Sequence, residues 1–299
     1  MRQFPDKLPD NPHADPSWHH GRALDTPLTP QPPPGTVEAW CLELVTTTDL
    51  EGKLRPAPPP DRWEPAPPAR RLAAPGRPAG LSRTARAPRT PRPEALVDPR
   101  ARARLVHAFL HHELQAAELF AWAILAFPAA PREFRAGCLR LAREELAHLA
   151  LYRAHLAHLG ATCGDFPVRD WFWERVGGVR DELAFVAWLG LGLEGANLEH
   201  SARFAAAFRA AGDEEGARIL ERVEHDEVGH VAFARAWFEH WSGAPLDYER
   251  WRAVLPRPLT PAVLRGLPLN RTARARAGLD AAFLARLEAE PATTTRSPR

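Results

Sequence analysis

The sequence predicts an all-α protein whose core is a four-helix bundle of two antiparallel hairpins joined by one long crossover. Three observations predict this fold. Four long helical stretches lie between residues 98 and 243, and short turns join them in pairs, with a longer connection between the pairs. Two Glu-x-x-His steps also stand 82 residues apart, each with another helix-borne glutamate upstream.

The first hairpin is predicted from a capping signal and two proline breaks. Asp98 and Pro99 begin a helix as N-cap and first-turn proline, and this helix runs to about Phe127. The second helix runs from about Pro131 to Leu159. Because only a few residues separate the two helices, we expect them to pack antiparallel.

The second hairpin is predicted from Asp181 to Ala211 and from Asp213 to about Gly243, with a tight turn between its helices. The connection between the hairpins, residues 160–180, is long enough to cross the length of a bundle. One long crossover between two hairpins is typical of the ferritin-like topology and not of a simple up-down-up-down bundle.

The flanks are rich in proline, because 22 of the 32 prolines fall in the first 100 residues. Such chain buries little surface and holds few regular helices. We therefore expect four regions: a disordered or extended tail (1–36), a Pro/Arg-rich segment that wraps the bundle (37–97), the bundle (98–243), and a C-terminal extension (244–299). Short helices are expected at Val37–Leu54 in the second region and Ala273–Glu288 in the last.

The spacing of acids and histidines predicts a site for two metal ions. Residues i and i+3 share one face of a helix, so the Glu and His of a Glu-x-x-His step can bind one ion together. The order Glu, ExxH, Glu, ExxH along four helices is the ligand set of a carboxylate-bridged dimetal site. The predicted ligands are Glu113, Glu145, His148, Glu194, Glu227 and His230.

The neighbours of these residues predict that they face the core. Glu145 has Leu141 and Leu149 one turn away on either side, and Glu227 lies in a similar apolar stripe. Buried unpaired carboxylates are costly, and two divalent cations would neutralise four of them. A set of carboxylates and imidazoles without thiolate suits iron, or manganese, better than structural zinc.

Several neighbouring acids leave alternatives open. Glu118 follows Glu113 by five residues, Glu199 follows Glu194 by five, and Glu144 precedes Glu145. A shift of five residues turns a side chain by about 140°, so only one of each pair can face inward squarely. Glu113 is favoured because its stripe is more apolar, and Glu199 is an additional carboxylate expected near the site. Whether Glu113 and Glu194 bridge the ions or bind one each stays open.

Two further residues are candidates to contact the ligands without binding metal themselves. Asp226 precedes Glu227 and could accept the second N–H of a ligand histidine, or it could be a solvated acid. Tyr152 lies one turn after His148 and could relay an electron, although core packing is the simpler interpretation. We expect no separate catalytic residues besides the metal ligands.

Composition excludes several classes of protein. The net charge of +2 gives no strong signal for nucleic acid or membrane binding. The three cysteines have no CxxC spacing, which argues against a disulfide scaffold or a rubredoxin-type iron site. No apolar run approaches about 18 residues and the N-terminus has no apolar signal core, so the expected location is the cytoplasm.

Longer stretches of the chain resemble a known family. The stretches are HHELQAAELFAWAILAFPAAPREFR, LAREELAHLALYRAHLAHLG, GDFPVRDWFW, GLEGANLEHSARF, DEVGHVAFARAWF and LPRPLTPAVLRGLPLNRTARARAGLD. They resemble the bacterial ferritin-like proteins catalogued as domain of unknown function 455, over most of residues 37–287. More distantly, they are similar to rubrerythrins and tRNA-modifying diiron monooxygenases. The E-L-Q-A run at Glu113 resembles the E-x-Q-A of rubrerythrins, which supports Glu113 over Glu118.

Ligand set and resemblance together predict a diiron, or manganese/iron, oxidoreductase that uses O₂ or a peroxide on a substrate that the sequence does not specify. The alternative is a metal-handling protein that binds, oxidises or stores iron. The partners that such a protein could have are a small-molecule substrate, an external electron donor and a second copy of the chain in a homodimer.

Overall fold

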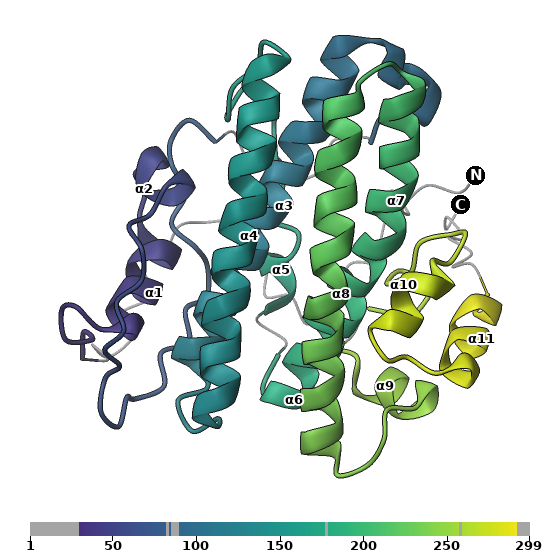
Figure 1. Cartoon of the computed structure of the whole chain (residues 1–299). Helices are drawn as coiled ribbons and strands as arrows, with labels where there is room; N and C mark the ends of the chain where they lie inside the picture. Colours follow the sequence, from purple (N-terminus) through teal and green to yellow (C-terminus); the bar gives the residue numbers. More distant parts are fainter. Residues whose placement is uncertain (1–29, 82–83, 85–89, 177–178, 257–258, 292–299) are drawn as a thin grey trace, which may run out of the picture.

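The computed structural model describes residues 30–81, 84, 90–176, 179–256 and 259–291. In that part of the chain the regular elements are helices, and the long ones stand side by side in the middle of the molecule (Figure 1). The all-α prediction is therefore confirmed. Within the described ranges, no helix is both long and apolar enough to cross a membrane.

The first hairpin consists of α3 (Pro99–Ala126) and α4 (Arg132–His158), close to the predicted bounds. The Asp98 carboxylate accepts a hydrogen bond from Arg100 N at 2.9 Å, which caps α3. Residues 127–131 turn the chain, and the two helices then pack along each other. A short 3₁₀ helix, η2 (Pro93–Val97), precedes α3.

The second hairpin follows the crossover and is helical almost from end to end, as predicted. Asp213 caps its last helix by accepting from Gly216 N at 2.9 Å, and Gly243 ends that helix with φ +67°. Its segments are α6 (Glu182–Phe185), η3 (Val186–Glu194), α7 (Gly195–Ala210) and α8 (Glu214–Ser242).

The segment η3 has π-helical geometry, which helical periodicity in the sequence did not indicate. The N–H of Gly195 is bonded to the carbonyl of Gly190, five residues earlier. Wide turns of this kind occur frequently at functional sites. Here the π-helical segment ends at Glu194, one of the predicted ligands.

Close packing of η3 on α8 depends on Gly190. A Cβ atom on Gly190 would lie 2.3 Å from the Cβ of Ala234. We expect Gly190→Ala to lower the free energy of unfolding by about 1–3 kcal/mol, measured by chemical denaturation. Gly229→Ala on α8 is the matched control, because a Cβ there meets no atom within 4 Å and should be neutral or stabilise by about 1 kcal/mol or less. Equal effects of the two substitutions would contradict the packing argument.

The flanking helices differ from the predictions in one respect each. The single helix expected at Val37–Leu54 is two, α1 (Val37–Thr46) and α2 (Leu50–Leu54), because Asp49 caps a new start by accepting from Gly52 N. The single helix expected at Ala273–Glu288 is also two, and Gly278 separates them with φ +89°. The C-terminal extension contains α9 (Tyr248–Val254), α10 (Arg271–Arg276) and α11 (Ala281–Ala289).

The N-terminal segment lies along α3 and is held there by a buried acid. Glu118 on α3, fully buried, accepts from Lys53 Nζ at 2.7 Å and from Arg77 Nη1 at 2.6 Å. The crossover, which carries the short helix α5 (Trp173–Val176), reaches the same acid through Trp173 Nε1 at 2.8 Å. Of the tail predicted for residues 1–36, positions 1–29 lie outside the described residues.

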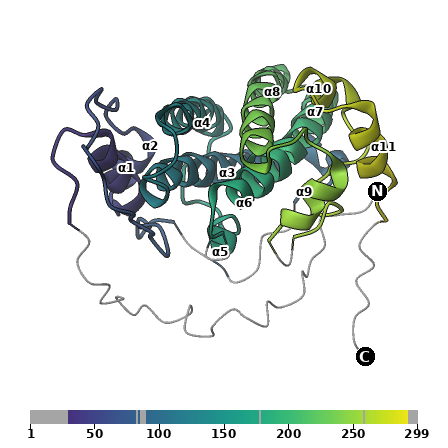
Figure 2. The same cartoon turned by 90° about the horizontal axis from the view of Figure 1, so that it is seen from below.

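The C-terminal extension is held on the opposite side of the bundle in the same manner (Figure 2). Glu199 on α7 accepts from Arg274 Nε at 2.8 Å and from the backbone N–H groups of Gly266 and Asn270 at 3.0 Å each. Glu118 and Glu199 each follow a predicted ligand glutamate by five residues. Each half of the bundle therefore turns one glutamate inward and uses the next to fix an extension.

Candidate metal centre

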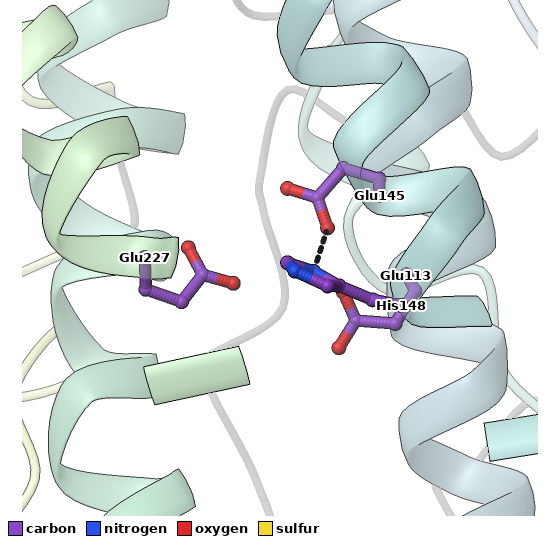
Figure 3. A group of neighbouring side chains, drawn as sticks. All are labelled: Glu113, Glu145, His148 and Glu227. Carbon is purple, nitrogen blue, oxygen red and sulfur yellow. Dashed lines mark hydrogen bonds and ion pairs between the residues drawn. The ribbon is translucent and has the colours of Figure 1, made fainter. Parts of the chain in front are cut away.

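The six predicted ligands meet inside the bundle. Glu113 comes from α3, Glu145 and His148 from α4, and Glu194 from the end of η3, while Glu227 and His230 come from α8. All six side chains are buried, with exposed fractions between 0% and 5%. Figure 3 shows Glu227 directed from its helix toward Glu113, Glu145 and His148.

Their oxygen and nitrogen atoms form two overlapping groups, each with three carboxylates and one imidazole. One group contains Glu113 and His148, the other Glu194 and His230, and both contain Glu145 and Glu227. Within each group, one ligand atom per residue lies within 4.8 Å of all the others. Glu145 and Glu227 therefore stand where they could contact two ions, whereas Glu113 belongs to one group and Glu194 to the other.

Both imidazoles turn Nδ1 toward the carboxylates. His148 Nδ1 lies 3.3 Å from Glu145 Oε2 and 3.6 Å from Glu113 Oε2. His230 Nδ1 lies 2.9 Å from Glu145 Oε1 and 3.0 Å from Glu227 Oε2. These distances place five of the six potential ligands around one small volume, and the sixth, Glu194, belongs to the same group as His230.

Several of these atoms are buried without a hydrogen bond, which tests whether the residues fit a pair of cations. They are Glu145 Oε1, Glu194 Oε1, Glu227 Oε2 and His230 Nδ1. His230 Nδ1 is within 3.0 Å of two carboxylate oxygens, yet the directions do not suit hydrogen bonds. Buried polar atoms normally have partners. Buried oxygen and nitrogen atoms that converge without hydrogen bonds are the arrangement that metal ligands adopt, so the residues fit.

Electrostatics agree with this interpretation. Burial, and then the neighbouring carboxylates, raise the pKa of Glu113 and of Glu194 well above the usual value. Burial by itself would lower the pKa of His148, but Glu113 and Glu145 raise it to about 11. Glu113 and Glu194 are thus disfavoured as charged carboxylates, whereas the histidines lower the pKa of Glu145 and themselves hold protons that balance its charge. Cations would remove both effects.

Two acids on the outer side of the bundle hold the other nitrogen of each imidazole. Asp226 Oδ2 lies 3.3 Å from His148 Nε2, and Glu144 Oε2 lies 2.9 Å from His230 Nε2. The contacts are reciprocal between the two helices. Asp226 of α8 contacts His148 of α4, and Glu144 of α4 contacts His230 of α8. Each nitrogen Nδ1 is thereby aimed at the centre. The interpretation of Asp226 as an orienting acid agrees with this geometry.

Glu144 was considered in the sequence only as an alternative to Glu145. A longer repeat could have identified its role. The pattern Arg-x-x-x-(Asp/Glu)-Glu-x-x-His occurs at residues 140–148 and again at 222–230. In both copies the arginine binds the outer acid of its own helix, Arg140 with Glu144 at 3.2 Å and Arg222 with Asp226 at 2.7 Å.

Two other predicted residues have different surroundings. Tyr152 is buried beside the centre: burial, followed by the charges of Glu113, Glu227 and Glu145, raises its pKa well above the usual value. Glu199, expected near the site, points instead to Arg274, since its position five residues beyond Glu194 turns it to another face of the helix.

Comparison with known proteins identifies the family. A family model described as "Protein of unknown function (DUF455)" matches residues 39–285. The chain belongs to this family. The matched range contains all six ligand candidates and also Lys53, Arg77 and Arg274, which fix the two extensions. The DUF455 match therefore covers the anchored extensions as well as the bundle.

An uncharacterized protein of Haemophilus influenzae is similar to this DUF455 protein, with 28% identity over 185 residues. The alignment covers 59% of the present chain and 64% of that protein, which is less than two thirds of its length. No solved structure gives a significant match.

The outer acids of this DUF455 protein can be tested separately from the ligands. Both line a surface hollow of about 360 Å³ between α4 and α8, so changing them leaves the core intact. We expect Asp226→Asn and Glu144→Gln each to weaken metal binding by about 10- to 100-fold, measured by competition with a chelating dye. Arg218→Gln, at an exposed position of α8, is the control. Unchanged affinity in both variants would show that the acids do not orient the histidines.

Proposed function

We propose that this DUF455 protein is a ferritin-like dimetal-carboxylate protein, most simply a diiron one with manganese as the alternative metal. Its proposed activity is the O₂- or peroxide-dependent oxidation of a small molecule. The observation that supports the proposal is the pair of overlapping buried groups that share Glu145 and Glu227. The hairpin–crossover–hairpin order of the helices supports the ferritin-like relation.

The donor set favours iron or manganese. Each group offers three carboxylates and one imidazole and no thiolate, which suits these metals better than zinc or copper. None of the three cysteines belongs to either group.

Two such ions, when bound, would supply the two electrons that reduce O₂ or a peroxide. The protein contributes ligands, orientation and a dry environment. Asp226 and Glu144 fix the imidazole rings from outside the centre. Phe120, Leu149 and Val231, all nearly or fully buried, form part of the apolar shell that excludes bulk water.

The electrons for turnover would come from an external donor, since two of the cysteines are buried core residues and none is placed as an iron ligand. A small-molecule substrate, a homodimeric assembly and a cytoplasmic location complete the proposal.

Anaerobic loading with Fe²⁺ followed by exposure to O₂ tests the proposed function. We expect about two iron ions per chain, rapid O₂ consumption in proportion to the iron bound, and an absorption band that forms and then decays. Uptake of iron far beyond two ions per chain would indicate storage in place of oxidation. A protein that binds no iron under these conditions would overturn the proposal.

Metal loading should also release protons. In the metal-free protein His148 is protonated at neutral pH, because its pKa is raised to about 11. A metal ion bound by His148 would displace a proton from the imidazolium, so the affinity for metal should rise with pH up to about 11. The stability of the metal-free protein should depend on pH in the opposite direction. The raised pKa of His148 stabilises the fold fully below about pH 6.5, and this stabilisation is lost as the pH rises through about 11. Titration with Co²⁺ in weak buffer with a pH indicator measures the protons released, and no release would contradict the prediction.

A further inference from the structure

Glu145 and Glu227, the two carboxylates shared by both ligand groups, differ in the residues that contact their oxygens. Glu227 Oε1 accepts a hydrogen bond from Asn197 Nδ2 at 2.9 Å. Ser201 Oγ donates to Asn197 Oδ1 at 3.1 Å, which fixes the amide with its N–H toward Glu227. Glu145, in contrast, has both oxygens directed to imidazoles, Oε2 to His148 and Oε1 to His230.

This difference is already present in the sequence. Asn197 follows Glu194 by three residues on the same helical face. The corresponding position three residues after Glu113 is Ala116, whose side chain has no donor. The two halves of the bundle repeat the ligands and the outer acids, but they do not repeat this amide.

The amide limits what Glu227 can reach. Because Oε1 accepts from Asn197, the oxygen of Glu227 without a hydrogen bond is Oε2, which lies 3.0 Å from His230 Nδ1. Glu145 Oε1 lies 2.9 Å from the same nitrogen. Around His230, then, two carboxylate oxygens are within 3.0 Å, whereas the oxygens nearest His148 Nδ1 stand at 3.3 and 3.6 Å.

We propose that Asn197 makes the two metal positions unequal by tethering Glu227 to the His230 side. The position beside His230 fills first and tightly, and the position beside His148 fills second and more weakly. This inference rests on the proposed function. It assigns Asn197 as a positioning residue that acts on the metals through Glu227 and is itself no metal ligand.

Its location makes Asn197 suitable for such a role. The side chain is half-buried, while Glu227 is fully buried, so the amide connects the centre to a less enclosed face of α7. A loosely held ion beside a tightly held one gives a centre in which one ion can change its coordination while the other stays in place.

Equilibrium titration with Co²⁺ alone, followed by visible absorption and calorimetry, tests the inference. The wild-type protein is expected to bind two ions in resolved steps whose dissociation constants differ by at least about tenfold. In Asn197→Ala, Glu227 Oε1 becomes available to the second ion, and the two constants should come within about threefold of each other. Ser201→Ala keeps the amide but loosens it, so its effect should be intermediate.

Two further variants assign the steps. His148→Ala should keep the tight step and lose the weak one, and His230→Ala should lose the tight one. Circular dichroism of the metal-free variants confirms folding. A wild-type ratio of constants in Asn197→Ala, or loss of the tight step in His148→Ala, would overturn the inference and leave the dimetal site standing. A wild-type protein that binds no Co²⁺ would instead overturn the proposed function and this inference with it.

Discussion

Replacing Glu145 by glutamine should reduce the metal content from about two ions per chain to nearly none. Glu145 belongs to both ligand groups and lies between the two histidines, 3.3 Å from His148 Nδ1 and 2.9 Å from His230 Nδ1. Glutamine keeps the size of the side chain but removes the charge that both ions would share. No other single ligand except Glu227 belongs to both groups.

Metal content after loading with Fe²⁺ and gel filtration measures this effect. Glu133→Gln is the matched control, because Glu133 lies on the same helix α4 and is exposed. The control should retain wild-type iron. Retention of two ions by Glu145→Gln would exclude the shared-carboxylate arrangement.

Glu118→Gln should destabilise the fold by about 3–5 kcal/mol without loss of metal. Glu118 is fully buried and pairs with Lys53 at 2.7 Å and Arg77 at 2.6 Å. The substitution would leave the buried Lys53 without a carboxylate and Arg77 with Asp170 as its remaining acid, and the N-terminal segment would lose its anchor on α3. The free energy of unfolding, measured by denaturant titration, reports the loss.

Glu113→Gln, five residues earlier on the same helix, is expected to lower the metal affinity without lowering the stability of the metal-free protein. Burial and the charge of Glu145 raise the pKa of Glu113, so its ionised form costs stability above the ordinary carboxyl pKa. Glutamine removes that cost, and the metal-free variant should be as stable as wild type or more so. Its metal affinity should fall, because Glu113 supplies one of the three carboxylates of its ligand group. Identical phenotypes for the two substitutions would refute the assignment of Glu113 to the metal centre and of Glu118 to the anchor of the N-terminal segment.

The sequence predicted the long helices because their signals are local. Asp98 caps α3 and Gly243 ends α8, as their residue types indicate. The flanking helices were predicted less well, since caps at Asp49 and Asp280 divide each expected helix in two. Capping acids inside apolar stretches compete with periodicity, and only the packed chain shows which signal prevails.

The ligands of the metal centre were predictable because their signals are local as well. A Glu and a His three residues apart share a face whatever the tertiary structure, and apolar neighbours predict that this face is buried. The roles of Glu199 and Glu144 were not predictable in this way. Glu199 depends on Arg274, 75 residues later, and Glu144 depends on His230, 86 residues later.

The sequence by itself therefore determined which six residues can serve as ligands and which helices carry them, because spacing within a helix fixes the direction of each side chain. Only the tertiary structure decided that Glu145 and Glu227 are shared, that each outer acid serves the opposite histidine, and that Asn197 restrains one of the shared carboxylates. Those relations join atoms on different helices, and their distances follow from how the helices pack.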